Sequence, residues 1–260
     1  MNILVFLKIV SQQQFADTLT NQESRLSSGN LIPNPTDMYA LELALRVKDK
    51  DHGTVITVLS MAPKSYESEL QSLLAMGVDE VVLVADMKLA GSDTLATARA
   101  LAAAVDKLPP QDLLLCGKKS LDSETGHIGP QLASLLDYPL ASNVSDFSCE
   151  NGLYITCLRD HSVQSYQGAY PAILTVCNGT KMVRSPSILQ MRRSRNKVVA
   201  SMDLEALELS PEQVGSIGSP TRVIQTVNLS MGHKHGIVTH DLEQGVSQLA
   251  ATIKELGAVQ

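Results

Sequence analysis

Small and polar residues suited to phosphate binding are concentrated in one stretch of the chain, residues 117–130. A buried-strand pattern at residues 112–116 precedes it, and a helical pattern at residues 131–136 follows it. A loop in this position offers backbone N–H groups to an anion, and the helix N-terminus adds a partial positive charge. We therefore expect the loop to contact a phosphate-bearing molecule. The candidate contacts are Gly117, Lys118, Ser120, Asp122, Ser123, Thr125, Gly126, His127 and Gly129.

Each of these side chains could instead have a purely structural role. Ser123 or Thr125 could cap the following helix, so that the loop would be an ordinary strand-to-helix turn. His127 could donate to a phosphate or a flavin, cap the helix, or lie exposed. Asp122 could bind ribose hydroxyls or only orient the loop, and Lys118 could neutralise phosphate or be solvated.

Strand and helix patterns alternate along the first half of the chain. Strands are expected at residues 2–9, 54–59, 80–84 and 113–116, and helices at residues 34–50, 65–76, 92–107 and 131–136. We expect Thr36 or Asp37 to cap the first helix, and Gly77 to end the second. Ser92 or Asp93 is expected to begin the third. This alternation predicts right-handed βαβ units, and hence a Rossmann-like α/β fold with helices on both faces of a parallel sheet.

The pattern changes after Tyr138. Short β-type runs at residues 153–158, 162–166 and 172–176 have no helix between them, which predicts an antiparallel or mixed extension of the sheet. Residues 181–197 then contain six basic residues and no acid, typical of a solvated face or of a docking surface for an acidic partner.

The last part of the chain is different again. Residues 198–237 look irregular, and residues 241–256 have the periodicity of an amphipathic helix that Gly257 would cap. A long loose segment that ends in a lone helix is unusual for a compact domain. We therefore expect an α/β nucleotide-binding domain over residues 1–200 and an arm over residues 201–260, whose helix packs on another subunit.

Composition and charge exclude several classes of protein. Hydrophobic residues make up 44% of the 260 residues, enough for a sizeable core, and the net charge of −6 argues against a nucleic-acid-binding surface. No apolar run reaches the ~20 residues that span a membrane, and the chain starts with a strand pattern rather than a signal or transit peptide. The four scattered cysteines fit a reducing compartment. We expect a cytoplasmic protein without membrane insertion.

Motifs of catalysis and metal binding are missing from the sequence. It contains no GxSxG elbow, HExxH, Walker lysine loop or CxxC pair, and no convincing nucleophile–base set. His233, His235 and His240 lie close together, but no Cys or carboxylate cluster accompanies them at ligand spacing. We therefore predict no metal site and no bond-making catalysis by this chain.

Four motifs follow one another in a characteristic order. They are Val5-Phe6-Leu7-Lys8, Asn34-Pro35-Thr36-Asp37 with residues 40–46, Leu74-Ala75-Met76-Gly77-Val78-Asp79, and the 117–130 loop. In this order and spacing they resemble the β subunit of electron transfer flavoproteins, over roughly residues 1–200. The resemblance implies an α/β fold that pairs with an FAD-carrying α subunit. It also implies a carrier of electrons between a flavin-dependent dehydrogenase and a membrane quinone reductase or another acceptor.

The same resemblance implies an adenine nucleotide in this chain. The nucleotide is AMP in ordinary members of the family and a second FAD in electron-bifurcating relatives. Asn34 and Asp37 would flank it, Phe6 and Met61 would lie near its adenine, and residues 117–129 would hold its phosphate. The pattern Asp122…Thr125…Gly129-Pro130 is nearer to that of the bifurcating relatives.

The chain departs from the family pattern at several positions. Lys119-Ser120 stand where the family usually has Gln-Ala, and Ser123-Glu124 where it often has Gly-Asp. His161-Ser162-Val163 replace an acidic cluster. Ser185 precedes Pro186 where the family's docking loop presents a leucine. These differences indicate a divergent member whose partner recognition differs from that of the acyl-CoA dehydrogenase systems.

Two other classes of function remain open. One is an ATP-binding regulatory module that resembles the universal stress proteins, a homodimer that would need no C-terminal arm. The other is a nucleotide-dependent enzyme, adenylating or hydrolytic, for which the sequence lacks a phosphate-activating motif. Stable co-purification with a larger flavin-containing subunit distinguishes the electron carrier from both.

Overall fold

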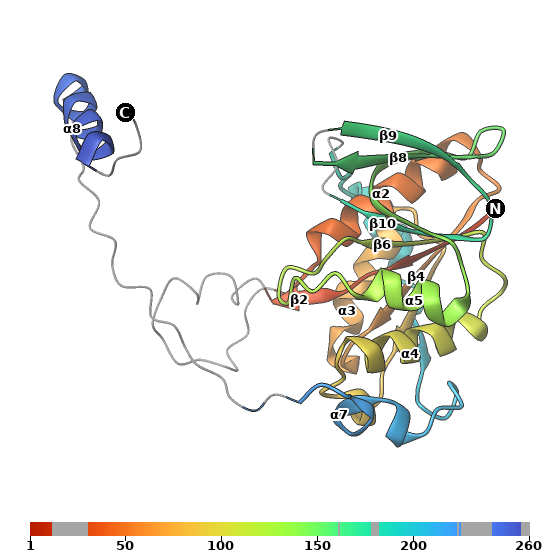
Figure 1. The fold of residues 1–260 in the computed structure, drawn as a ribbon. Helices are drawn as coiled ribbons and strands as arrows, with labels where there is room; N and C mark the ends of the chain where they lie inside the picture. Colours follow the sequence, from red (N-terminus) through yellow and green to blue (C-terminus); the bar gives the residue numbers. More distant parts are fainter. Residues whose placement is uncertain (12–30, 161, 178–181, 223, 225–240, 256–260) are drawn as a thin grey trace. The chain divides into compact units, whose positions relative to one another are not determined.

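The computed structural model describes residues 1–11, 31–160, 162–177, 182–222, 224 and 241–255. The contacts divide the chain into two compact units, Met1–Ile224 and Gln225–Gln260. Figure 1 shows the first unit as a sheet with helices packed on it, and the helix α8 (Leu242–Glu255) in the second.

A nine-stranded sheet forms the centre of the first unit, in the order β11-β5-β4-β1-β6-β10-β7-β8-β9. Its strands are β1 (Asn2–Phe6), β4 (Val55–Met61), β5 (Glu80–Val84), β6 (Leu113–Gly117), β7 (Leu140–Ser148), β8 (Leu153–Arg159), β9 (Ser162–Gly168), β10 (Ala172–Val176) and β11 (Ala200–Met202). A separate antiparallel pair consists of β2 (Ile9–Ser11) and β3 (Leu31–Pro33). The pairings from β11 to β7 are parallel, which confirms the predicted α/β class.

Helices and short helical turns connect these strands. The α-helices are α2 (Pro35–Lys50), α3 (Glu67–Gln71), α4 (Thr94–Asp106), α5 (Ile128–Leu136), α6 (Ile188–Ser194) and α7 (Gly215–Gly218). The 3-10 turns are η1 (Lys64–Tyr66), η2 (Ser72–Met76), η3 (Met87–Leu89) and η4 (Pro211–Gln213). No helix in the described ranges is long and apolar enough to cross a membrane.

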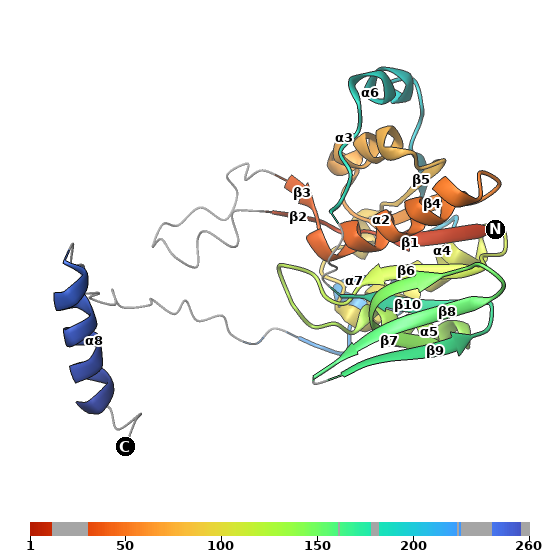
Figure 2. The ribbon, with the colours of Figure 1, turned by 90° about the horizontal axis from the view of Figure 1, so that it is seen from above.

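Both faces of the central sheet are buried, as the apolar strand sequences require. On β1, Ile3 and Val5 pack into one core cluster with residues of α2, α3 and η2. Leu4 and Phe6 pack into a second cluster with residues of α4 and α5. The two layers of helices can be followed in Figures 1 and 2. Successive side chains of a strand point to opposite faces of the sheet, so alternate residues of β1 belong to the two different clusters.

The ends of three helices test the predicted caps. Asp93 begins α4 by accepting a hydrogen bond from the Ala96 N–H at 2.9 Å, and Gly77 ends η2 in the left-handed region with φ of 109°, both as predicted. The predicted cap of α2 is wrong. Asn34 occupies the cap position without a side-chain cap, and the Asp37 carboxylate accepts from the backbone of Lys8 and Gly117 instead.

The second half of the sheet agrees with the prediction only in part. β8 and β9 form the expected antiparallel extension, but β10 lies between β6 and β7 in the parallel part. All five β10 residues are buried, which fits a central strand. β7 was not predicted. It pairs in parallel with β10 and antiparallel with β8, and the change of partner falls beside Asn143, whose φ is 58°.

The segment after residue 197 contains more structure than its composition indicates. β11 pairs with β5 at the edge of the sheet, and Leu204, Leu207 and Val214 are buried against the second core cluster. A three-residue strand is too short to give a periodic signal, which is why the sequence looks irregular there. The helix expected at residues 241–256 is α8, whereas Gly257, its expected cap, lies outside the described residues.

Candidate functional site

The candidate site lies where the order of the strands reverses. From β1, the chain reaches β4 on one side through α2, and it later reaches β6 on the other side through α4. In open α/β sheets, the crevice outside the carboxyl ends of two such strands is the usual place for a ligand. Lys8, which follows β1, and the 117–127 loop, which follows β6, are both at this edge.

A buried carboxylate joins the two strand ends. The oxygens of Asp37, in the first turn of α2, accept from the Lys8 N–H at 2.9 Å and from the Gly117 N–H at 2.8 Å. Burial raises the pKa of Asp37 to about 6, although these hydrogen bonds and the Lys8 charge oppose the rise. A Cβ on Gly117 would lie 2.7 Å from the Asp37 nitrogen, so only glycine allows the loop to start this close to α2.

Asn34 holds the next part of the loop. Its side chain accepts from the Leu121 N–H at 3.0 Å and donates to the Lys119 carbonyl at 3.1 Å, and its own N–H donates to the Lys8 carbonyl. Asn34 is only 1% exposed. The structure therefore gives Asn34 and Asp37 the task of holding the loop, while direct contact of either with a nucleotide stays a prediction.

Charged and hydroxyl side chains fix the outer part of the loop. Lys8 Nζ pairs with Asp122 at 2.5 Å, and the hydroxyls of Ser120 and Ser123 are 2.8 Å apart. Burial opposes ionisation of Asp122, but hydrogen bonds from Lys8 and Ser120 lower its pKa below the ordinary value. This arrangement supports the loop-orienting role considered for Asp122.

The end of the loop presents backbone donors. Gly126 has a φ of 67°, in the region that favours glycine, and a Cβ there would lie 3.1 Å from the Lys118 carbonyl. Within the described part of the chain, the backbone N–H groups of Gly126, His127 and Ile128 donate no hydrogen bond to a protein acceptor. His127 occupies the cap position of α5 without a side-chain cap bond, so neither Ser123 nor Thr125 caps this helix. Such donors at a helix N-terminus fit a phosphate.

The start of α4 also contributes, a feature that the sequence analysis missed. The Thr94 hydroxyl accepts from Gln131 Nε2 at 3.2 Å and lies 3.5 Å from Nδ1 of His127. The Oε1 atom of Gln131 is buried and has no hydrogen-bond partner within the described residues. The first turns of α4 and α5, which pack side by side on one face of the sheet, thus meet at the site. The polar residues at the start of the 92–107 helical pattern were the sequence signal that could have indicated this contribution.

The remaining predicted residues take different positions. Phe6 is 4% exposed and packs in the same core cluster that the partly buried Met61 borders. Lys118 is exposed and lines a hollow with Asn143 and Cys177. Gly129 is buried in α5, and Thr125 is exposed. Their contacts with a ligand stay predictions.

The described residues hold no group of three or more metal-ligating side chains. His233, His235 and His240 lie outside these residues. All four cysteines are free thiols, and burial raises the pKa of the Cys116 thiol. A buried thiol with a raised pKa is a poor nucleophile.

Comparison with known proteins gives a consistent family assignment for this chain. A model of the electron transfer flavoprotein domain matches residues 26–209. The electron transfer flavoprotein subunit beta of Thermoanaerobacterium thermosaccharolyticum is 34% identical over 253 residues, which cover 96% of each chain. The corresponding subunit of Megasphaera elsdenii is 35% identical over 234 residues, 86% of each chain. The caffeyl-CoA reductase-Etf complex subunit CarD of Acetobacterium woodii is 33% identical over 196 residues, 75% of each chain.

Proposed function

Because the chain belongs to the electron transfer flavoprotein family, as a β-type subunit, we propose that it binds an adenine nucleotide at the 117–127 loop. The proposed nucleotide is AMP or a second FAD. The observation that carries the proposal is the loop itself. Asn34 and Asp37 hold it at the strand reversal, and its terminal N–H groups have no acceptor among the described residues. Oriented backbone donors at a helix N-terminus suit the phosphates of either nucleotide.

The residues around the loop fit such a ligand. Lys8 and Lys118 supply positive charge near the expected phosphates. The Gln131 oxygen, which lacks a hydrogen-bond partner in the described ranges and lies beside Thr94, suits a hydroxyl or N–H donor of the ligand. A flavin, when bound, supplies the redox chemistry, and the chain contributes binding, orientation and electrostatics. We accordingly propose an electron carrier subunit rather than an enzyme.

The proposed partner in a heterodimer is an FAD-carrying α subunit. The helix α8 supports this part of the proposal. Leu242, Val246 and Leu249 recur at spacings of four and three residues, and they are 82%, 59% and 62% exposed. An apolar stripe at this spacing is typical of a helix that packs on another protein. Val246→Asp is expected to weaken assembly with the α subunit, while Gln248→Asp, off the stripe, is not.

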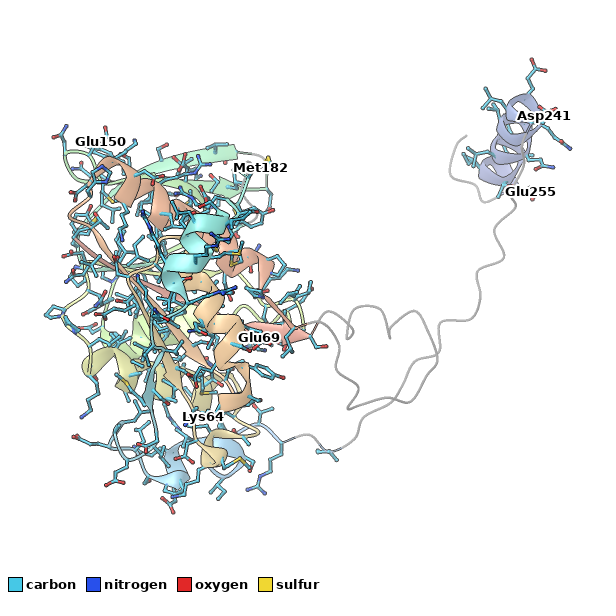
Figure 3. The ribbon with its side chains drawn as sticks, turned by 180° about the vertical axis from the view of Figure 1, so that it is seen from behind. Lys64, Glu69, Glu150, Met182, Asp241 and Glu255 are labelled. Atoms are coloured by element: carbon cyan, nitrogen blue, oxygen red, sulfur yellow. The ribbon has the colours of Figure 1, made fainter. Side chains whose placement is uncertain are left out.

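The proposed docking surface for redox partners is the α6 patch, which we define as Ile188, Leu189, Met191, Arg192 and Arg193. The three apolar side chains are 70%, 56% and 44% exposed, and the two arginines are exposed beside them. Exposed apolar side chains with a cationic rim suit a partner with an apolar site and an acidic edge. Figure 3 shows the face that carries α6, with Met182 and Glu69 labelled near it. We propose a flavin dehydrogenase and a quinone reductase, or another acceptor, as the redox partners.

Co-expression with the cognate α subunit tests this function. We expect a stable heterodimer whose FAD is reduced by its flavin-dependent dehydrogenase when that enzyme is supplied with its substrate. Replacing Ile188 and Leu189 together with Ser should slow this reduction without dissociating the heterodimer. A homodimer that retains ATP and does not assemble with the α subunit would contradict the proposal.

A further inference from the structure

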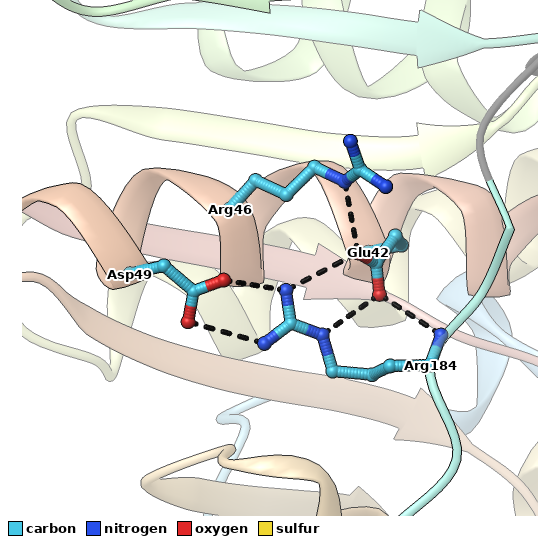
Figure 4. A network of polar contacts seen from close by, with 4 residues as sticks. All are labelled: Glu42, Arg46, Asp49 and Arg184. Carbon is cyan, nitrogen blue, oxygen red and sulfur yellow. Dashed lines mark hydrogen bonds and ion pairs between the residues drawn. The ribbon is translucent and has the colours of Figure 1, made fainter.

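The segment that leads into α6 is tied to α2 by one arginine. Arg184 Nε donates to Glu42 at 2.9 Å, and its Nη2 donates to the second Glu42 oxygen at 3.1 Å. The same guanidinium donates to both oxygens of Asp49, at 3.1 and 2.7 Å. The Arg184 backbone N–H also donates to Glu42, at 3.1 Å. Figure 4 shows Arg184 making all these contacts with two carboxylates of α2, Glu42 and Asp49.

This network is balanced in charge and partly removed from water. The side chain of Glu42 is 4% exposed and also accepts from Arg46 Nε at 2.9 Å. Burial opposes ionisation of Glu42, but its bonds with Arg184 and Arg46 lower its pKa below the ordinary value. Two carboxylates therefore face two guanidiniums. A planar guanidinium can bind both carboxylates in this way, and an ammonium cannot.

The other end of α6 is fixed by different contacts. Gln71 Nε2 donates to the carbonyls of Arg195 and Lys197 at 3.3 and 3.0 Å. Lys197 Nζ donates to the Val78 carbonyl at 3.4 Å, and Val199 is 6% exposed. The helix is thus held between Arg184 on one side and the contacts at Gln71 and Val78 on the other.

The helix between these fixed points has little stability of its own. α6 has seven residues, and only Ser194 among them is buried. Isolated helices shorter than about 12–15 residues are marginal in water, even when a capping box such as that of Ser187 and Gln190 is present. The order of the α6 patch therefore depends on its packing against η2 and on its end contacts, and the Arg184 network is the most extensive of those end contacts.

We propose that Arg184 is a positioning residue that fixes the α6 patch in its docking conformation before a redox partner arrives. The proposal rests on the docking role proposed above for this patch. A surface that is already ordered binds without a further loss of conformational entropy, and a loosened one must be ordered during each encounter. Arg184 is set back from the patch, since its guanidinium is occupied by Glu42 and Asp49.

A positioning role and a purely electrostatic role of Arg184 predict different effects of its substitution. Arg184→Lys keeps the positive charge but loses the planar fork, so a positioning role predicts a defect and a purely electrostatic role predicts none. Arg184→Gln with Glu42→Gln removes the network without leaving a buried charge unpaired, which protects the fold. Arg192→Gln is the matched control, because it removes one arginine of the patch whose side chain is not part of the network.

The experiment uses the heterodimer with its α subunit. Hydrogen–deuterium exchange is measured over residues 182–199, together with kcat and KM for the heterodimer as electron acceptor of its flavin-dependent dehydrogenase in the presence of that enzyme's substrate. For Arg184→Lys and for the double variant we expect exchange in α6 and the KM each to rise about tenfold, with kcat unchanged. Arg192→Gln should leave exchange unchanged and should alter KM mainly through its salt dependence.

Every outcome decides the proposal. Unchanged exchange in Arg184→Lys and in the double variant would overturn it, as would faster exchange with an unchanged KM, which would make Arg184 only structural. If the wild-type heterodimer accepts no electrons from the dehydrogenase, the proposed docking role fails, and the positioning proposal that rests on it falls too. The exchange data would then still show whether Arg184 orders α6.

Discussion

Gly129 lets α5 pack against the sheet more closely than any other residue would allow. A Cβ at this position would lie 3.1 Å from Sγ of Cys116 and would overlap the Thr175 Cγ2 methyl group. Carbon atoms in contact are normally about 3.5–4.0 Å apart. Thr175 is only 4% exposed, so neither it nor α5 can move without disturbing the core. Gly129→Ala should therefore destabilise the protein by about 2 kcal/mol.

Thermal unfolding of the heterodimer measures this effect. A loss of about 2 kcal/mol lowers the Tm by about 4–8 °C for a chain of this size. The same variant should retain less nucleotide, because α5 carries the end of the loop at its N-terminus. Gly53→Ala is the control, since among the described residues its Cβ would approach only Asp51 Oδ1, at 3.3 Å.

A double variant tests the physical reason directly. Thr175→Ser removes the Cγ2 methyl group and keeps the hydroxyl oxygen, which is 3.4 Å from the Asn143 N–H. Combined with Gly129→Ala, it should recover more than about 1 kcal/mol of the lost stability, together with the nucleotide. If the double variant loses the sum of the two single effects, steric overlap with Thr175 is not the cause of the lost stability.

Three further predictions concern the anchors of the loop. Since burial raises the pKa of Asp37 to about 6, its stabilising effect is complete below about pH 4 and is lost as the pH rises through 6. The free energy of unfolding is measured in urea for the wild type and for Asp37→Asn. The excess stability of the wild type should fall by about 2 kcal/mol between pH 4.5 and pH 7.5. A difference that does not change with pH would contradict this. Asp122→Ala breaks a partly exposed ion pair, so it should change stability by less than about 1 kcal/mol but lower the nucleotide content measured by chromatography. Glu150→Ala, which breaks the exposed Lys50 pair, should leave that content unchanged. Thr94→Val removes the hydroxyl that accepts a hydrogen bond from Gln131. It should lower the stability measured by thermal unfolding by about 1 kcal/mol and should reduce the amount of bound nucleotide. Unchanged stability and unchanged nucleotide content would argue against a place for Thr94 in the site.

The parallel core could be predicted because its signals are local. The apolar runs of β1, β4, β5 and β6 and the helical periodicity of α2 and α4 each lie within a short window of sequence. Caps with one strong donor–acceptor pair were also predictable, as at Asp93. The place of β10 was not, because whether a buried strand lies in the centre or in an extension depends on contacts distant in the sequence.

The residues of the candidate site could be located from sequence better than their tasks could be assigned. The types at 34, 37 and 117–129 indicate a loop that meets a helix start, and the structure brings these residues together. Whether a polar side chain faces a ligand or the backbone depends on its tertiary surroundings, which the local sequence does not specify. Asp37 was therefore expected to flank a ligand or cap its helix, and instead joins Lys8 to Gly117. Thr94 was missed because its neighbours His127 and Gln131 are more than 30 residues away.

The nucleotide content of the purified heterodimer shows whether this chain holds an adenine nucleotide of its own. The bound nucleotides are released by denaturation, and FAD, AMP and ATP are quantified per heterodimer, for the wild type and for Gly117→Ala, whose Cβ would lie 2.7 Å from the Asp37 nitrogen. We predict one adenine nucleotide beyond the FAD of the α subunit, either AMP or a second FAD, and its loss from Gly117→Ala. One FAD and no further nucleotide in the wild type would contradict the account.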